Sequence, residues 1–146
     1  MGIRNPPQGV APGAIKAVKT ANETVNNSTV LQNDDALFIA LDANARYAFI
    51  LVTEIQIKAA SDINTVFTIP AGASGNRIAM AGTSTFAVTN ITTAVTYLVA
   101  APDTIMPRTI GIITTGGTAG NLQLQWAQNT AAVEDTIMNA GSYLIL

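Results

Sequence analysis

Histidine and cysteine are both absent from this chain of 146 residues. Without cysteine, the chain can form neither a disulfide nor a thiolate metal site. Without histidine, it lacks the commonest general base, the commonest metal ligand and every catalytic triad that contains histidine. We therefore predict that the chain is not an enzyme and has no catalytic, metal-binding or cofactor-binding residues.

Charged residues are scarce, at 11% of the sequence, compared with about 25% in a typical soluble domain. The net charge of −2 argues against nucleic acid as a partner. No apolar run approaches the ~18 residues that cross a bilayer, and the N-terminus has no apolar signal segment, so we expect synthesis in a cytoplasm and no membrane contact. A polar but nearly uncharged surface favours a protein that is covered by copies of itself or by neighbours.

The first 15 residues are predicted to form an extended arm in front of the folded domain. Half of the six prolines lie there, and proline at this density prevents a helix and favours extended backbone. Residues 1–19 carry three bases and no acid, whereas the remaining 127 residues carry four bases and nine acids. A basic arm can dock on an acidic neighbouring subunit. The predicted contact residues are Arg4, Pro6 and Pro7 of the arm and Lys16 directly after it.

Two stretches with a period of two, 116–128 and 46–58, are expected to be partners at the centre of the fold. In the first, Leu122, Leu124 and Trp126 alternate with polar or small residues, which makes Trp126 a core residue. In the second, one face is apolar except at Thr53, and the opposite face is apolar only in its first half. That half comprises Ala48, Ile50 and Val52. It is either a seam between subunits or the far side of a two-layer core.

The rest of the chain is divided into short β segments, about ten in all, with a turn signal every 8–12 residues and no helical period. Residues 15–25 and 46–59 are each expected to form one strand, and Gln32 to Asp35 to form a turn. The predicted fold is all-β: a single antiparallel β-sandwich, jelly-roll-like, over residues 16–146, preceded by the arm.

Two sets of carboxylates are candidates for chemistry. Asp34, Asp35 and Asp42 lie at the two ends of one predicted strand and could bind calcium, but they lack the spacing of a dedicated loop, which favours ordinary turn acids. Glu54 with Asp62 is the pair to consider for glycoside hydrolysis. With one Trp, three Tyr and four Phe in the chain, aromatic platforms for a sugar are few, and no complete site can be assembled.

Several segments, in their order and spacing over residues 25–146, resemble β-sandwich structural proteins of tailed bacteriophages, found on heads and in tail fibres. They are residues 27–38, 41–47, 67–73, 120–128 and 140–144. The resemblance implies a structural role in the virion and a trimer, and it carries over no catalytic residue.

The expected function is that of a capsid decoration, or cement, protein. It would bind the major capsid protein or other virion proteins, and neighbouring copies, through the arm and the face of Ala48, Ile50 and Val52. The alternative is a tail-fibre or receptor-binding module for host glycans. That alternative predicts exposed aromatic and carboxylate side chains at loop tips, with Phe86, Tyr97 and Tyr143 as the aromatic candidates.

Overall fold

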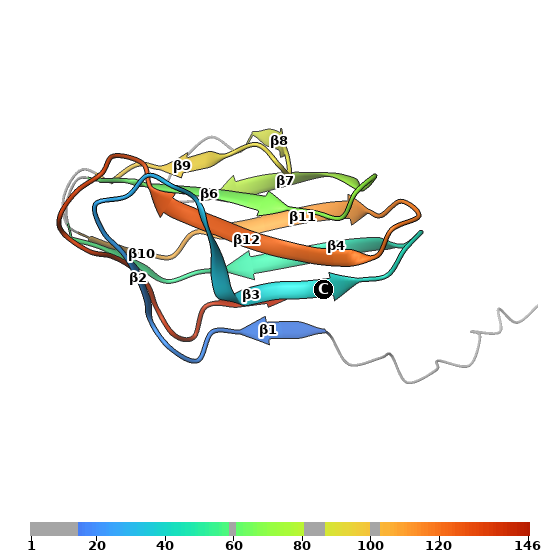
Figure 1. The fold of residues 1–146 in the computed structure, drawn as a ribbon, viewed down its shortest axis with the longest axis horizontal. Coiled ribbons are helices and arrows are strands. Elements are labelled where there is room, and N and C mark those ends of the chain that lie inside the picture. Colours follow the sequence, from blue (N-terminus) through green and yellow to red (C-terminus); the bar gives the residue numbers. More distant parts are fainter. Residues whose placement is uncertain (1–14, 59–60, 81–86, 100–102) are drawn as a thin grey trace, which may run out of the picture.

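The computed structural model describes residues 15–58, 61–80, 87–99 and 103–146 (Figure 1). These residues form fourteen strands and no helix, which confirms the all-β prediction. The strands are β1 (Lys16–Val18), β2 (Glu23–Val25), β3 (Gln32–Leu41), β4 (Arg46–Val52), β5 (Ile55–Ile57), β6 (Ile63–Thr68), β7 (Ser74–Met80), β8 (Val88–Asn90), β9 (Val95–Tyr97), β10 (Asp103–Ile105), β11 (Arg108–Thr114), β12 (Gly120–Gln128), β13 (Thr136–Met138) and β14 (Tyr143–Ile145).

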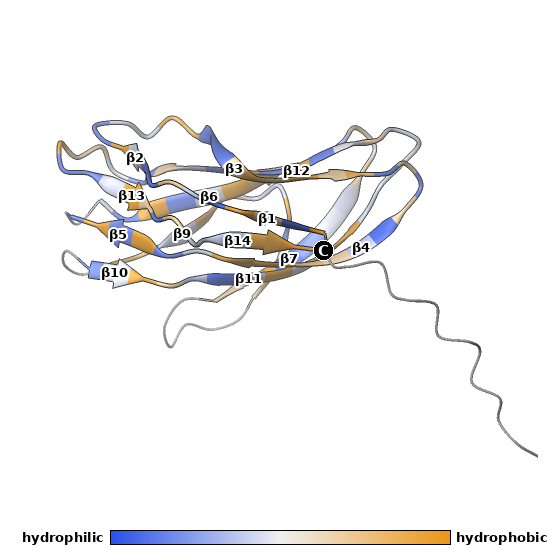
Figure 2. Cartoon of the chain, turned by 90° about the horizontal axis from the view of Figure 1, so that it is seen from below, coloured by the Kyte–Doolittle hydropathy of each residue, from blue (hydrophilic) through white to orange (hydrophobic). Residues whose placement is uncertain are grey.

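The strands pair as a rolled-up antiparallel ribbon. β1 pairs with β14, β3 with β12, β4 with β11, and β6 with β9, so segments from the two ends of the chain meet in nested order. Rolling this ribbon gives a six-stranded sheet, β1-β14-β4-β11-β7-β8, and a four-stranded sheet, β3-β12-β6-β9. In Figure 2, β3 and β12 lie on one side of the molecule and β14 and β11 on the other. This is the jelly-roll order, with the β7–β8 pair added to one sheet.

A second four-stranded sheet, β10-β5-β13-β2, prolongs the six-stranded sheet at one end. Strands β10, β5, β13 and β2 continue strands β11, β4, β14 and β1, respectively, in the same side-by-side order. The ladder is interrupted where Thr53 faces Pro107. The amide of Thr53 donates to the Pro107 carbonyl at 3.1 Å, but proline has no N–H to return a bond. The predicted strand 46–59 is therefore divided into β4 and β5, while residues 15–25 contribute β1 and β2.

The core lies between the two layers and is filled by Trp126, Phe49, Phe67 and aliphatic side chains. The expected core position of Trp126 is confirmed. The rings of Phe49 and Phe67 meet edge to face, with centroids 5.2 Å apart. Gly111 on β11 makes room for Phe49, because a Cβ there would lie 2.3 Å from the ring.

Two further local predictions were wrong. The stretches 116–128 and 46–58 are not partners, since β12 lies in the four-stranded sheet with β3 and β6 whereas β4 lies across the core between β14 and β11. Gln32 to Asp35 are not a turn but the start of β3, where the pairing with β12 shifts register between Gln123 and Gln125. This bulge lets Asp34 turn inward.

Candidate functional site

The outer face of the six-stranded sheet is the candidate site, because it is apolar and no described element covers it. Along β4, Phe49 and Leu51 point into the core, whereas Ala48 and Ile50 are exposed and Val52 is half-buried. Ile50 keeps 44% of its surface exposed. The same alternation on β11 leaves Ile110 and Ile112 exposed.

Strand register joins these side chains into one row. Ile145, Ile50, Ile110, Ile78 and Val88 stand opposite one another on β14, β4, β11, β7 and β8. We call this the outer apolar row. A shallow depression over β7, β8 and β11 adds Ala48 and Ile112 to its lining. Monomeric proteins rarely expose apolar patches larger than a few hundred Å², and larger ones mark interaction sites.

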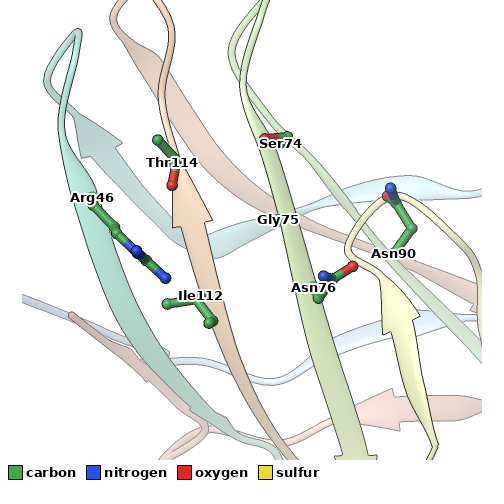
Figure 3. Close-up of a pocket in the computed structure, with 7 residues that line it drawn as sticks. All are labelled: Arg46, Ser74, Gly75, Asn76, Asn90, Ile112 and Thr114. Carbon is green, nitrogen blue, oxygen red and sulfur yellow. The ribbon is translucent and has the colours of Figure 1, made fainter.

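A polar pocket adjoins the row at the end where β4 begins. Figure 3 shows the Arg46 side chain extending toward Ile112, with polar side chains on the neighbouring strands. The lining residues are Arg46, Ser74, Gly75, Asn76, Asn90, Ile112 and Thr114. The guanidinium has no carboxylate within ion-pair distance among the described residues. A guanidinium beside hydroxyl and amide groups is suited to a planar acceptor such as a carboxylate.

The charged residues on the six strands of this face are all basic. Arg46 and Arg108 lie at the two ends of the face, and Lys16 lies on β1 opposite Ile145. No acidic residue occupies an outward position on β1, β14, β4, β11, β7 or β8. The face therefore has an apolar centre and a basic rim.

The structure brings together four of the predicted partner-binding residues, Lys16, Ala48, Ile50 and Val52, on this face. The exposure of Ala48 and Ile50 does not fit the far side of a two-layer core, so a seam between subunits remains as the prediction. Arg4, Pro6 and Pro7 lie outside the described residues, as does most of the predicted arm.

The calcium candidates are arranged differently from the expectation. Asp34 is buried and accepts hydrogen bonds from Lys19 Nζ at 3.0 and 3.1 Å and from Trp126 Nε1 at 3.2 Å. Lys19 is buried as well and also pairs with Glu23. No three His, Cys, Asp or Glu side chains of the described residues gather where they could hold a metal ion. Asp34 thus belongs to a buried ion-pair network that fixes β3 to the chain before β2.

Glu54 and Asp62, the pair considered for glycoside hydrolysis, each make a structural hydrogen bond. Glu54 accepts a hydrogen bond from the Asn139 side-chain amide at 3.0 Å. Asp62 accepts one from the backbone amide of Val99 at 2.8 Å. Each carboxylate fixes a different junction of the chain.

Two features were missed by sequence reasoning. Arg77 is buried, donates to the carbonyls of Thr65 and Thr93 at 2.8 Å, and lies over the Phe67 ring at 5.3 Å. Burial lowers the pKa of Arg77 below its ordinary value. No pattern around Arg77 signals this position. The contribution of β11 to the outer face did have a signal, because residues 109–114 are apolar on both faces.

The described residues contain no helix long and apolar enough to cross a membrane. Comparison with protein-family models, with curated proteins and with solved structures finds no match to this chain.

Proposed function

We propose that this chain is a structural protein of a tailed-phage virion that coats the head as a decoration protein. The observation that carries the proposal is the outer apolar row, which leaves one broad face of the jelly roll without a cover. The order of the sequence segments that resemble phage β-sandwich proteins supports the same role. Jelly rolls are found in viral capsid proteins and in lectins, so the fold alone does not choose between them.

The size of the face suits a protein interface. Strands β4, β7 and β11 have seven residues each, and β1, β8 and β14 have three each. At about 3.4 Å per residue and about 4.8 Å between strands, the face covers on the order of 500 Å². Stable interfaces bury about 800 Å² per partner, so this face supplies more than half of a standard interface. Covering its aliphatic side chains contributes about 25 cal/mol for each Å² removed from water.

Repetition strengthens such a contact. A decoration protein meets the same partner at many equivalent positions, and neighbouring copies hold one another in place, which raises the overall avidity. The low charge content of the chain fits a protein that spends its working life packed among other subunits. The mechanism is mechanical: apolar area buried across subunit junctions resists the outward pressure of the packaged DNA.

The alternative is a receptor-binding module for host glycans. The polar pocket around Arg46 favours it, because hydroxyl and amide groups there could bind sugar hydroxyls. The exposed aromatic side chains that this alternative predicts find less support. Tyr97 is buried against Thr109 and Tyr143 is half-buried on β14, while Phe86 lies outside the described residues.

Co-sedimentation with phage heads tests the proposal. Expanded heads that lack surface proteins are mixed with the full chain, with residues 16–146, with the double variant Ile50→Lys and Ile110→Lys, and with Phe38→Lys. Phe38 is a matched control, since it is 43% exposed on the opposite side of the sandwich.

We expect the full chain to saturate the heads at high stoichiometry, the double variant to lose at least about tenfold in affinity, and Phe38→Lys to bind normally. Loss of binding by the 16–146 chain would assign part of the affinity to the arm. Absence of binding by the full chain, or equal binding by the double variant, would contradict the decoration role and direct the next test to host glycans.

A further inference from the structure

We infer that the outer apolar row of one copy receives the loop end of a second copy, so that copies associate head to tail. The loop end consists of the connections 26–31, 61–62, 98–99 and 129–135, which meet at the end of the sandwich near β2 and β10 (Figure 1). The inference rests on the proposed function in that it takes the outer apolar row as an interface, and it names the partner.

The loop end presents the most exposed aliphatic side chains among the described residues. Leu98 is 78% exposed, Val133 75% and Val30 74%. These three residues come from separate connections and project from one end of the molecule. Exposed aliphatic groups gathered at one place mark a second surface that gains by being covered.

Two of these tips are held rigidly. The buried side chain of Gln128 donates to the Glu134 carbonyl at 2.8 Å and accepts from the amides of Ala132 at 3.0 Å and Ser28 at 3.3 Å. The amide of Asn27 also donates to the Ala132 carbonyl at 2.7 Å. A tip that is already ordered loses little conformational entropy on binding, so Val30 and Val133 are suited to act as anchors.

The charges of the two surfaces are opposite. The loop end and the strand ends beside it carry four acids, Asp62, Asp103, Glu134 and Asp135, with Lys58 as the only base, a charge of −3. Lys58 already lies 3.7 Å from Asp135. On its six strands the rim of the outer apolar row carries three bases and no acid, a charge of +3, and the nearest acid along the chain is the half-buried Glu54, two residues past Val52. A head-to-tail contact therefore pairs acids with bases.

Other occupants of the face are disfavoured by the same charges. A two-fold contact of face against face would place one basic rim against another, with no acid between them. Residues 1–14 carry Arg4 and no acid, so the arm of a neighbouring copy is not attracted to this face either. The arm is better matched to the acidic loop end.

One pair of residues defines the register of the contact. On the loop end, an exposed aliphatic side chain, Val133, is followed directly by an exposed acid, Glu134. On the face, Ile112 adjoins the pocket in which Arg46 has no carboxylate partner among the described residues. Val133 packs on Ile112 while the Glu134 carboxylate binds the Arg46 guanidinium, for which a two-pronged hydrogen bond is the preferred geometry.

This contact joins two different surfaces, so it is heterologous. Heterologous contacts close into rings when the rotation between copies permits, and otherwise continue as filaments. A closed ring of a few copies is the form compatible with the trimer that the phage resemblance implies.

Charge exchange tests the pairing. Sedimentation velocity is measured for the full chain, for Arg46→Glu, for Glu134→Arg and for the double exchange, with Asp35→Arg on β3 as a control for the charge change of Glu134→Arg. We expect each single exchange to weaken self-association at least about tenfold and the double exchange to recover most of it. Circular dichroism confirms that each variant is folded.

Cysteine cross-linking gives a second, independent readout, because the natural chain has no cysteine. Ile112→Cys and Val133→Cys chains are oxidised mildly, alone and mixed. Head-to-tail association predicts a disulfide-linked dimer only in the mixture. A dimer formed by Ile112→Cys alone would overturn the inference in favour of a face-to-face contact.

A monomeric full chain at about 100 µM, or a double exchange that recovers nothing, would also overturn the inference. The proposed function fails separately. A monomer that still coats heads through Ile50 and Ile110 removes only the head-to-tail contact, whereas rings that bind no heads remove only the decoration role.

Discussion

The two broad faces of this sandwich are built on the same alternation of side chains, yet their outward side chains differ in polarity. On the four-stranded sheet the outward residues are mainly amides and hydroxyls that bind one another. Gln125 donates to the Asn33 side chain at 2.8 Å, Asn64 donates to Asn129 at 2.9 Å, and Thr96 donates to Asn64. On the six-stranded sheet the corresponding positions form the outer apolar row.

The comparison separates a surface whose polar groups bind one another from one whose aliphatic groups are left exposed. Amide groups that satisfy one another stay soluble with little charge and offer few free groups to a neighbouring protein. Aliphatic side chains can be satisfied only by being covered. Low charge is therefore accompanied by amides that bind one another on one face and by exposed aliphatic side chains on the other. Composition alone does not distinguish the two.

The largest expected loss of stability comes from substituting Asp34, which is buried beneath the amide face. Asp34→Ala removes one of the two carboxylates that pair with the buried Lys19 ammonium, leaving only Glu23, and it removes the acceptor of the Trp126 indole N–H. Breaking a buried pair in this way costs about 3–5 kcal/mol, and urea denaturation measures it. Asp35→Ala, at the exposed neighbouring position, should change the free energy of unfolding by less than about 0.5 kcal/mol. Equal effects at the two positions would show that the buried network does not hold β3.

A smaller loss of stability is expected for Gly111→Ala, which tests the core side of the six-stranded sheet. Its Cβ would lie 2.3 Å from the Phe49 ring and 2.8 Å from the Asn76 carbonyl oxygen. Overpacking of this kind costs about 1–3 kcal/mol, which thermal denaturation detects. Gly117→Ala has nothing within 4 Å of its Cβ and is the control, with unchanged or slightly raised stability. An unaffected Gly111→Ala variant would mean that Phe49 can move aside.

The sequence predicted faces better than partners. Alternation in 46–58 correctly put Phe49 and Leu51 on one face of the strand and Ala48 and Ile50 on the other, although it left open whether that second face was covered. It cannot specify which strand lies alongside, and so β4 and β12 were expected to be partners although they face each other across the core. The outer apolar row appears only when register sets Ile50 beside Ile110 and Ile78.

The buried polar residues could not be predicted from the sequence either. Gln32 to Asp35 have the composition of a turn, and only the approach of Lys19 and Trp126 from elsewhere in the chain makes Asp34 a core residue. Arg77 is similar, since its acceptors are carbonyl groups of other segments. Such positions depend on tertiary contacts that no local pattern contains.

We propose that the outer face of the six-stranded sheet is covered in the working assembly and that the amide face stays exposed. Hydroxyl-radical footprinting of the unmodified chain, from dilute to concentrated solution and then with phage heads, distinguishes the two faces. We predict falling oxidation at Ile50, Ile110 and Val88 with unchanged oxidation at Phe38. Protection at Phe38, or equal exposure of both faces in every state, would contradict the account.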